Sequence, residues 1–240
     1  MAKTPSPPGG ATDGVEPFAG IQEAGFRFLR ELGKNNTRDW FHQHKTTYQS
    51  HVREPFALFL EELSETLQAR AIKMWGGPQT MFRVQRDIRF SKDKTPYQTH
   101  VSGLLTPTGD KEETGPIVYA HCDAKGGFCA SGMYNLPTPR LRVLRQRVVD
   151  KPSEAKKMVA ALEKQGLKLD PSGSLKRAPK GFESYADHEL GDLIRLKHWI
   201  VREDLKKADW KSGAVMGVLT DFIERSSPLL EFGRKALKRA

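Results

Sequence analysis

The densest concentration of chemically active side chains lies between residues 83 and 100, in the run RVQRDIRFSKDKTPYQTH. It combines arginines, lysines, hydroxyl groups and two aspartates within one short stretch. A guanidinium fork matches the oxygens of a carboxylate or a phosphate in a bidentate way, and a lysine adds a point charge. The segment is therefore typical of a site that binds a small anionic ligand.

The side chains expected to contact such an anion share a positive charge or a hydroxyl group. They are Arg83, Arg86, Arg89, Ser91, Lys92, Lys94, Tyr97 and, from a later segment, Tyr119. Asp87 and Asp93 are expected to form ion pairs that hold guanidinium groups in place. The same residues also fit a structural charge network that binds nothing. A nucleotide triphosphate site is disfavoured, because the Gly-Lys-Ser/Thr pattern of a phosphate loop is missing.

Two histidines, His100 and His121, are the candidates for catalytic proton transfer near this segment. A histidine beside arginines can act as a general acid or base, and the neighbouring cations disfavour its charged form. The alternative is that both are hydrogen-bonded histidines of a sheet, without a chemical role. Neither has carboxylates at the spacing of metal ligands, so we expect no metal and no cofactor.

The elements that position these groups follow from a change of hydrophobic period in the middle of the chain. Residues 80–90 alternate between apolar and polar, which predicts a strand. Residues 91–96 contain charged residues and Pro96, which predicts a turn, and residues 98–106 predict a second strand. Arg86 then falls on the apolar face of the first strand. Either a bulge redirects it, or it is buried against a carboxylate such as Asp93.

A glycine-rich hairpin is predicted from residues 116–123 and 127–134. A two-residue turn at Lys125-Gly126 would place Cys122 opposite Cys129, the two cysteines of the chain. Their number and spacing fit neither a disulfide framework nor a zinc site. Two small buried thiols are favoured over a cross-strand disulfide in a reducing compartment.

Helices are predicted on both sides of these strands. Before them, Thr37 is a candidate N-cap and Pro55 suits a first helical turn. After them, Pro152 can begin a helix, and Pro228 is expected to open a final one. Helices that flank a run of antiparallel strands, about residues 80–134, indicate an α+β fold. We expect one domain over residues 16–240 and a disordered tail over residues 1–15, which are rich in Pro, Gly, Ser and Thr.

Two further groups of residues border the predicted site. Trp40, Phe41 and Tyr48 are favoured as core aromatics, with a pocket wall as the alternative, and Lys45 is placed to reach the rim of the same pocket. Lys176, Arg177 and Lys180 belong to an irregular segment, residues 166–187, which fits either an exposed loop or a lid over an anionic ligand.

Charge and composition define the other function classes to weigh. The formal net charge is +10; residues 1–134 carry 16 Lys and Arg against 15 Asp and Glu, whereas residues 135–240 carry 23 against 14. The basic C-terminal half is compatible with nucleic-acid binding. A protein-interaction module without chemistry is the third alternative. No apolar run is long enough to span a membrane and the N-terminus has no secretory signal, so we expect no membrane partner and a cytoplasmic location.

The central motif resembles that of a known family. The runs NNTRDWF at residues 35–41 and RDIRFSKDKTPY at residues 86–97, together with the later hairpin, are similar to a family of bacterial and fungal proteins classified as a domain of unknown function. The resemblance covers about residues 17–225. Gln98 stands where the family usually has Lys, which removes one cation from the expected site. The resemblance implies no particular reaction.

Overall fold

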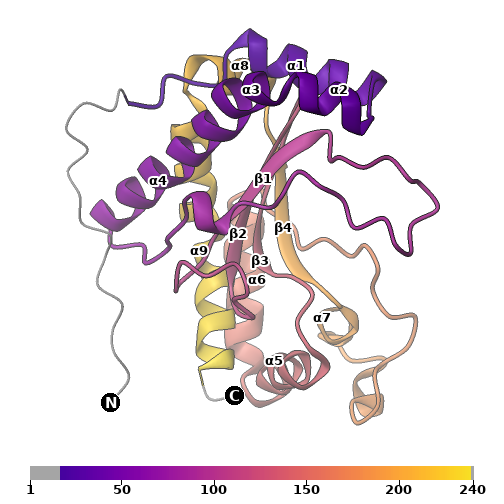
Figure 1. Ribbon diagram of the computed structural model, residues 1–240. Coiled ribbons are helices and arrows are strands. Elements are labelled where there is room, and N and C mark those ends of the chain that lie inside the picture. The colour runs from indigo at the N-terminus through magenta and orange to yellow at the C-terminus, as the bar shows by residue number, and fades with distance from the viewer. Residues whose placement is uncertain (1–16, 239–240) are drawn as a thin grey trace, which may run out of the picture.

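The computed structural model describes residues 17–238, and the chain folds as predicted into an α+β structure (Figure 1). The segment expected to be disordered, residues 1–15, lies outside the described residues. In chain order the elements are α1 (Glu23–Lys34), α2 (Arg38–Gln43), α3 (Lys45–Tyr48), the π-helical turn η1 (Gln49–Arg53), α4 (Glu54–Ala69), the 3-10 turn η2 (Pro78–Thr80), β1 (His100–Leu105), β2 (Ile117–Asp123), β3 (Gly126–Met133), α5 (Thr138–Asp150), α6 (Pro152–Lys164), the 3-10 turn η3 (Glu183–Tyr185), α7 (Gly191–Arg195), β4 (Trp199–Asp204), α8 (Lys207–Ser212) and α9 (Val215–Leu237).

The N-terminal helices begin where the sequence signals predict. The Thr37 hydroxyl accepts a hydrogen bond from the backbone N–H of Trp40, at 3.3 Å, and so caps α2. Pro55 lies in the first turn of α4, where a missing backbone N–H removes no helical hydrogen bond. Between these helices, η1 joins α3 to α4 without a break in the helical path. The result is a helical layer from residue 38 to residue 69.

The sheet is antiparallel, with the strand order β1-β2-β3-β4. Its fourth strand, β4, pairs with β3 although 65 residues separate the paired residues Met133 and Trp199 along the chain. One face of the sheet is closed by helices: α4 contacts β1, and α9 contacts β3. Along β2, side chains of that face are buried while those of the other face are half-buried. The second face is therefore the more open one.

Residues 80–90 do not form the predicted regular strand, although they run antiparallel to β1. Met81 pairs with Gly103, and the backbone N–H of Phe82 donates to the carbonyl of Ser102 at 2.9 Å. Beyond this point the pairing shifts, because the N–H of Gln98 donates to the carbonyl of Val84 at 2.7 Å. Arg83 is thus opposed by three residues, 99–101, instead of one. Such a bulge interrupts the ladder and bends the chain.

The apolar face predicted for residues 80–90 is also wrong. Val84 is buried, but Phe82 is 44% exposed and Phe90 is 95% exposed. After the bulge the chain leaves the sheet as a loop that projects from the body, visible at the right of Figure 1. The predicted apolar face fails because the chain leaves the sheet after the bulge, so the residues beyond it have no sheet surface to pack against.

The hairpin of β2 and β3 turns one residue earlier than predicted. Asp123 pairs with Gly126, so the turn is Ala124-Lys125, and Cys129 lies opposite Ala120 instead of Cys122. The Asp123 carboxylate explains this turn, because it accepts hydrogen bonds from the backbone N–H groups of Lys125 and Gly126, at 2.7 and 3.1 Å. Both cysteines are free thiols and fully buried. Burial raises the pKa of each.

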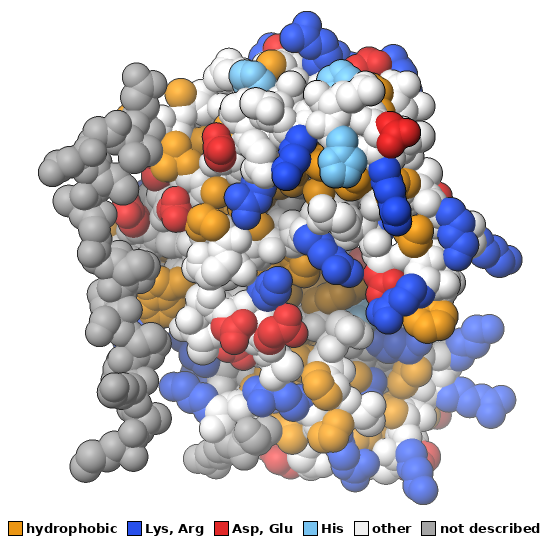
Figure 2. All heavy atoms as spheres, viewed as in Figure 1, with side chains coloured by type: hydrophobic (Ala, Val, Ile, Leu, Met, Phe, Trp, Pro, Cys, Tyr) orange, Lys and Arg blue, Asp and Glu red, His pale blue; other side chains and the backbone are white. Residues whose placement is uncertain are grey.

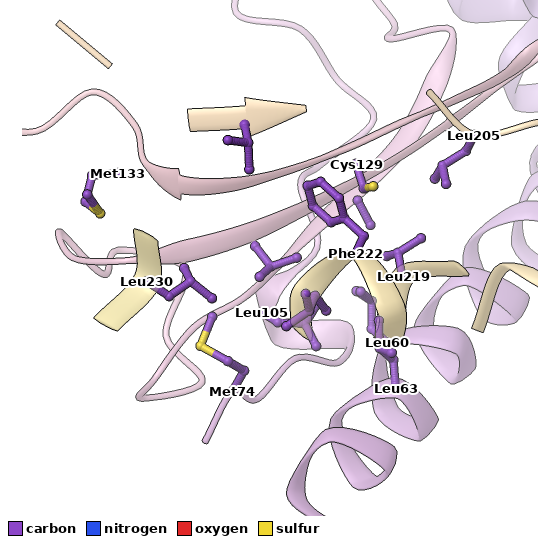
Figure 3. Packing of buried hydrophobic residues seen from close by; sticks show 14 of the residues in the cluster. Leu60, Leu63, Met74, Leu105, Cys129, Met133, Leu205, Leu219, Phe222 and Leu230 are labelled. Atoms are coloured by element: carbon purple, nitrogen blue, oxygen red, sulfur yellow. The ribbon is translucent and has the colours of Figure 1, made fainter. Parts of the chain in front are cut away.

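The helix α9 runs through Pro228, where the sequence predicted a new helix. It carries Leu219 and Phe222 into the core, where they meet Leu60 and Leu63 of α4 and Leu105 of β1 (Figure 3). The packing of α9 along its length offsets the hydrogen bond that Pro228 cannot donate. One hydrophobic cluster joins the N-terminal helices, the sheet and the C-terminal helices. Within residues 17–238, no helix combines the length and the apolar character that crossing a membrane requires.

A pair of glycine substitutions tests this arrangement. Gly132 in β3 has a φ of +134°, and a Cβ there would lie 2.0 Å from the Trp199 carbonyl oxygen of β4. We expect Gly132→Ala to lower the free energy of unfolding by about 2–4 kcal/mol through strain and overpacking. Gly217→Ala in α9 is the matched control, because a Cβ there meets nothing within 4 Å. It should raise stability by about 0.5–1 kcal/mol. Urea denaturation of both variants measures the difference, and equal effects would contradict the β3–β4 packing.

Candidate functional site

A cavity of about 240 Å³ lies between the helical layer and the first residues of the central motif. The helical side comes from α2, α3 and η1, and the opposite side is residues 81–85. Lys111 closes it from the loop between β1 and β2. Among the described residues that line it, the buried floor is largely apolar: Phe41, Tyr48, Met81 and Val84.

Four cations line this cavity: Lys45, Arg53, Arg83 and Lys111. The other polar lining residues in the described chain are Gln49 and Gln85, with the Tyr48 hydroxyl, and no Asp or Glu is among them. Within residues 17–238, none of the four cations forms an ion pair or a side-chain hydrogen bond. Figure 2 shows one face of the molecule, on which Lys and Arg side chains lie among hydrophobic, acidic and histidine side chains. The lining therefore carries net positive charge, and the N–H groups of its four cationic side chains are available to donate hydrogen bonds to a ligand.

The local fold explains how these four side chains converge. Lys45, Gln49 and Arg53 are spaced by four residues, so they follow one face of the continuous α3–η1 helical path. Arg83 sits at the bulge, where it has left the regular ladder of the sheet. Burial raises the pKa of Tyr48 to about 12, while the nearby Arg53 charge acts in the opposite direction. Tyr48 is thus a neutral hydroxyl donor on the floor at neutral pH.

Most of the predicted anion-binding motif lies outside this cavity. Of the motif side chains expected to contact an anion, only Arg83 is among the lining residues, and Arg86, Arg89, Ser91, Lys92 and Lys94 belong to the projecting loop or its base. Arg86 is braced at the base of the loop: one of its nitrogens donates to the Asp93 carboxylate at 2.5 Å and also reaches the carbonyl and hydroxyl oxygens of Thr95. Of the two positions open to Arg86, the structure adopts the pairing with Asp93.

The rest of the loop is held by its own charged groups. Arg89 donates two side-chain hydrogen bonds to Asp87, at 3.0 and 2.7 Å, and Lys94 donates to the carbonyl of Ile88 at 3.0 Å. The hydrogen bond from Arg89 holds the pKa of Asp87 at about 2. These contacts fit the structural charge network that the sequence left open, and they engage three of the cations that were expected to bind a ligand: Arg86, Arg89 and Lys94.

Tyr97 is a buried link between the motif and the helical layer. Its backbone N–H donates to the side-chain oxygen of Asn36 at 3.0 Å, and the Asn36 amide donates back to the Tyr97 carbonyl at 2.9 Å. Its ring stacks on Phe41, with centroids 4.1 Å apart. Tyr97 therefore supports a wall of the cavity from behind instead of contacting its contents, since it is not among the lining residues.

The two predicted catalytic histidines lie together on the open face of the sheet. The rings of His100 and His121 stack with centroids 4.1 Å apart, and His121 also stacks on Phe128. The Tyr119 hydroxyl and His121 Nδ1 are 3.1 Å apart, while His121 Nε2 is 3.6 Å from Asp123 Oδ2. Neither histidine lines the cavity, and neither does Tyr119. The structure brings the histidines to each other but not to Arg83.

Burial keeps this histidine pair uncharged. It lowers the pKa of His100, and together with the charge of His100 it lowers the pKa of His121 to about 4, although Asp123 acts in the opposite direction. At neutral pH His121 can therefore accept a proton but has none to give as an imidazolium. Within residues 17–238, no three His, Cys, Asp or Glu side chains are grouped to hold a metal ion.

Two of the cations that line the cavity were not predicted from the sequence. Arg53 and Lys111 lie outside the central motif, and only the four-residue spacing of Lys45, Gln49 and Arg53 could have indicated a polar stripe on one helical face. Nothing near Lys111 marks it. Conversely, the irregular segment with Lys176, Arg177 and Lys180 contributes no lining residue, so it does not cover the cavity in this structure.

The histidine pair provides a pH test. Because the folded-state pKa of His121 is about 4 against an ordinary value of 6.5, the unfolded chain binds a proton that the folded chain does not. The contribution of His121 to stability should therefore fall as the pH drops from 6.5 towards 4. NMR titration of the imidazole and urea denaturation across this range measure both effects. Asp123→Asn should lower the pKa of His121 further; an ordinary pKa would contradict its burial.

The comparisons with known proteins identify the family without adding an activity. Neither curated proteins nor solved structures gave a match to this chain. Residues 24–232 match a family described as a conserved hypothetical protein, DUF2461. The matched range contains the helical layer, the bulge at Arg83, the sheet and most of α9. On this match over most of its length, the chain belongs to the DUF2461 family.

Proposed function

We propose that this protein binds a small anionic ligand, a carboxylate or a phosphate, in the cavity lined by Lys45, Arg53, Arg83 and Lys111. The observation that carries the proposal is that four cations line one small cavity and that no described Asp or Glu pairs with them. Arg86 and Arg89 of the neighbouring loop are paired with Asp93 and Asp87, and other cations without an ion pair in the described chain, such as Lys92 and Lys176, do not line this cavity. Cations without partners around a hollow are what an anion site requires.

The types of donor suit oxygen anions. Two guanidinium groups, Arg53 and Arg83, offer planar forks from opposite sides of the cavity, and two ammonium groups add charge at its rim. The Tyr48 hydroxyl can donate from the floor. Because the apolar floor excludes water on one side, hydrogen bonds to an anion are stronger there than on an open surface.

The size of the cavity limits the ligand. Its volume of about 240 Å³ is below the range of about 300–1,000 Å³ that holds drug-sized molecules. A metabolite of a few carbon atoms with one or two anionic groups fits, whereas a dinucleotide would extend far beyond the lining residues. The proposal is for binding, since His100 and His121 lie outside the cavity and no lining residue is a histidine.

Nucleic-acid binding through the C-terminal half has less support. Sequence-tolerant binding of single strands uses exposed aromatic rings between cations. In this half Trp199, Trp210 and Phe222 are fully buried, and Phe232 is 4% exposed. A protein-interaction module without chemistry would leave the four cations of the cavity without a role, so we favour the anion site.

Matched arginine variants test the proposal. We expect inorganic phosphate and succinate to bind the full chain, and Arg83→Gln to weaken binding by roughly tenfold or more, because a charge-assisted hydrogen bond contributes about 1.5–3 kcal/mol. Arg89→Gln is the control, since Arg89 is exposed, paired with Asp87 and outside the cavity. It should leave the affinity unchanged. Isothermal titration calorimetry at low ionic strength measures both.

Two results would refute the anion site. One is that neither anion binds at millimolar concentration. The other is an equal loss of affinity in Arg83→Gln and Arg89→Gln, which would point to general surface charge. A melting temperature of Arg83→Gln close to that of the unaltered protein excludes misfolding as the cause.

A further inference from the structure

One wall of the cavity is an aromatic ring that the core does not use. Phe82 is 44% exposed and lines the cavity beside Arg83, whereas the other aromatic lining residues, Phe41 and Tyr48, are each only 4% exposed. Leaving so much of a phenylalanine in water forgoes much of the stabilisation that its burial would contribute. An exposed aromatic ring at the edge of a cation-lined hollow has the properties of a contact surface.

The backbone fixes where this ring lies. The N–H of Phe82 donates to the carbonyl of Ser102 just before the bulge, so Phe82 belongs to the last part of the segment that still follows β1. Its ring packs at one side against Tyr119, with centroids 6.1 Å apart and planes at 60°. Tyr119 in turn contacts Phe128. The ring of Phe82 therefore has one aromatic neighbour on the sheet, and 44% of the residue stays exposed.

The cavity thus offers two kinds of surface to one ligand. Its rim carries cations, and its floor and one wall are apolar: Phe41, Met81, Val84 and Phe82. A compact anion such as phosphate would contact only the cations at the rim, and the apolar lining residues would stay exposed to water. A ligand with an apolar body covers both, and a flat body gains more than a branched one, because aromatic rings favour offset-stacked or edge-to-face contacts.

Building on the proposed anion site, on which this inference rests, we propose that the ligand is an aromatic anion: a single planar ring that carries a carboxylate or phosphate group. The anionic group binds the cations, and the ring lies against Phe82 above the apolar floor. The space of about 240 Å³ between the lining residues suits one ring with its anionic group. Phe82 is then the residue that sets specificity, while Arg83 supplies affinity.

Matched pairs of anions separate the ring from the charge. Calorimetric titration with phenyl phosphate and methyl phosphate, and with benzoate and acetate, compares ligands that differ only in the ring. We expect the aromatic member of each pair to bind roughly tenfold more tightly, the ratio that one favourable ring contact produces. The better of the two aromatic ligands shows which anionic group the cations prefer.

Two variants assign this preference to Phe82. Phe82→Leu keeps apolar bulk but removes the ring, and it should reduce the phenyl-to-methyl ratio to about threefold or less; because the ratio is taken within one variant, a change in affinity common to both anions cancels. Phe82→Tyr keeps the ring and should retain the full ratio. Ring-proton NMR of the bound phenyl phosphate provides a second measurement, since stacking on an aromatic ring shifts those signals and Phe82→Leu should abolish the shift.

The outcomes distinguish this inference from the proposed function. If phenyl and methyl phosphate bind the unaltered protein equally well, the aromatic preference is refuted and the anion site stands. If the preference survives unchanged in Phe82→Leu, the ring binds elsewhere and the role of Phe82 is refuted. If none of the four anions binds, the anion site itself fails, and the inference fails with it.

Discussion

The arrangement of the site depends on one break in β-sheet pairing. Up to Phe82 the segment follows β1; from Val84 onwards it pairs two residues out of step, and three residues of the opposite chain face Arg83 alone. This bulge separates two groups of side chains that a regular strand would have kept together. Arg83 turns to the helical layer and the cavity, whereas His100, one of the three opposing residues, stays with the stacked rings on the sheet.

The same break divides the charges of the central motif by role. Beyond the bulge, Arg86 pairs with Asp93 and Arg89 pairs with Asp87, while Lys94 donates a hydrogen bond to a backbone carbonyl. These contacts stabilise the conformation of the loop. The cations with donors to spare come mostly from elsewhere: α3, η1 and the loop before β2. The high density of charge in the sequence therefore marks a loop whose charged groups mostly pair with one another, whereas the cations of the cavity come from segments far apart in the sequence.

Features set by local chemistry could be predicted from the sequence. The Thr37 cap, the start of α4 near Pro55 and the strands of the hairpin each follow from interactions within a few residues, and the α+β class follows from their order.

The features that could not be predicted depend on contacts between residues far apart in the sequence. The bulge arises from pairing between residues near 83 and 100, the continuity of α9 through Pro228 from packing on the core, and the position of Lys111 from loop geometry. The Ala124-Lys125 turn is an intermediate case, since the Asp123 side chain that fixes it is visible in the sequence but does not by itself choose between adjacent turns.

Four like charges around a small cavity also have a thermodynamic consequence for the empty protein. Lys45, Arg53, Arg83 and Lys111 place four like charges around one cavity, and of the described carboxylates only Asp87 is shown to interact with one of them, Arg83. An anion that enters the cavity acts as the missing counter-charge and stabilises the native state by mass action. If the proposed anion site binds phosphate more tightly than chloride, the free energy of unfolding is larger in a phosphate buffer than in a chloride buffer of the same ionic strength.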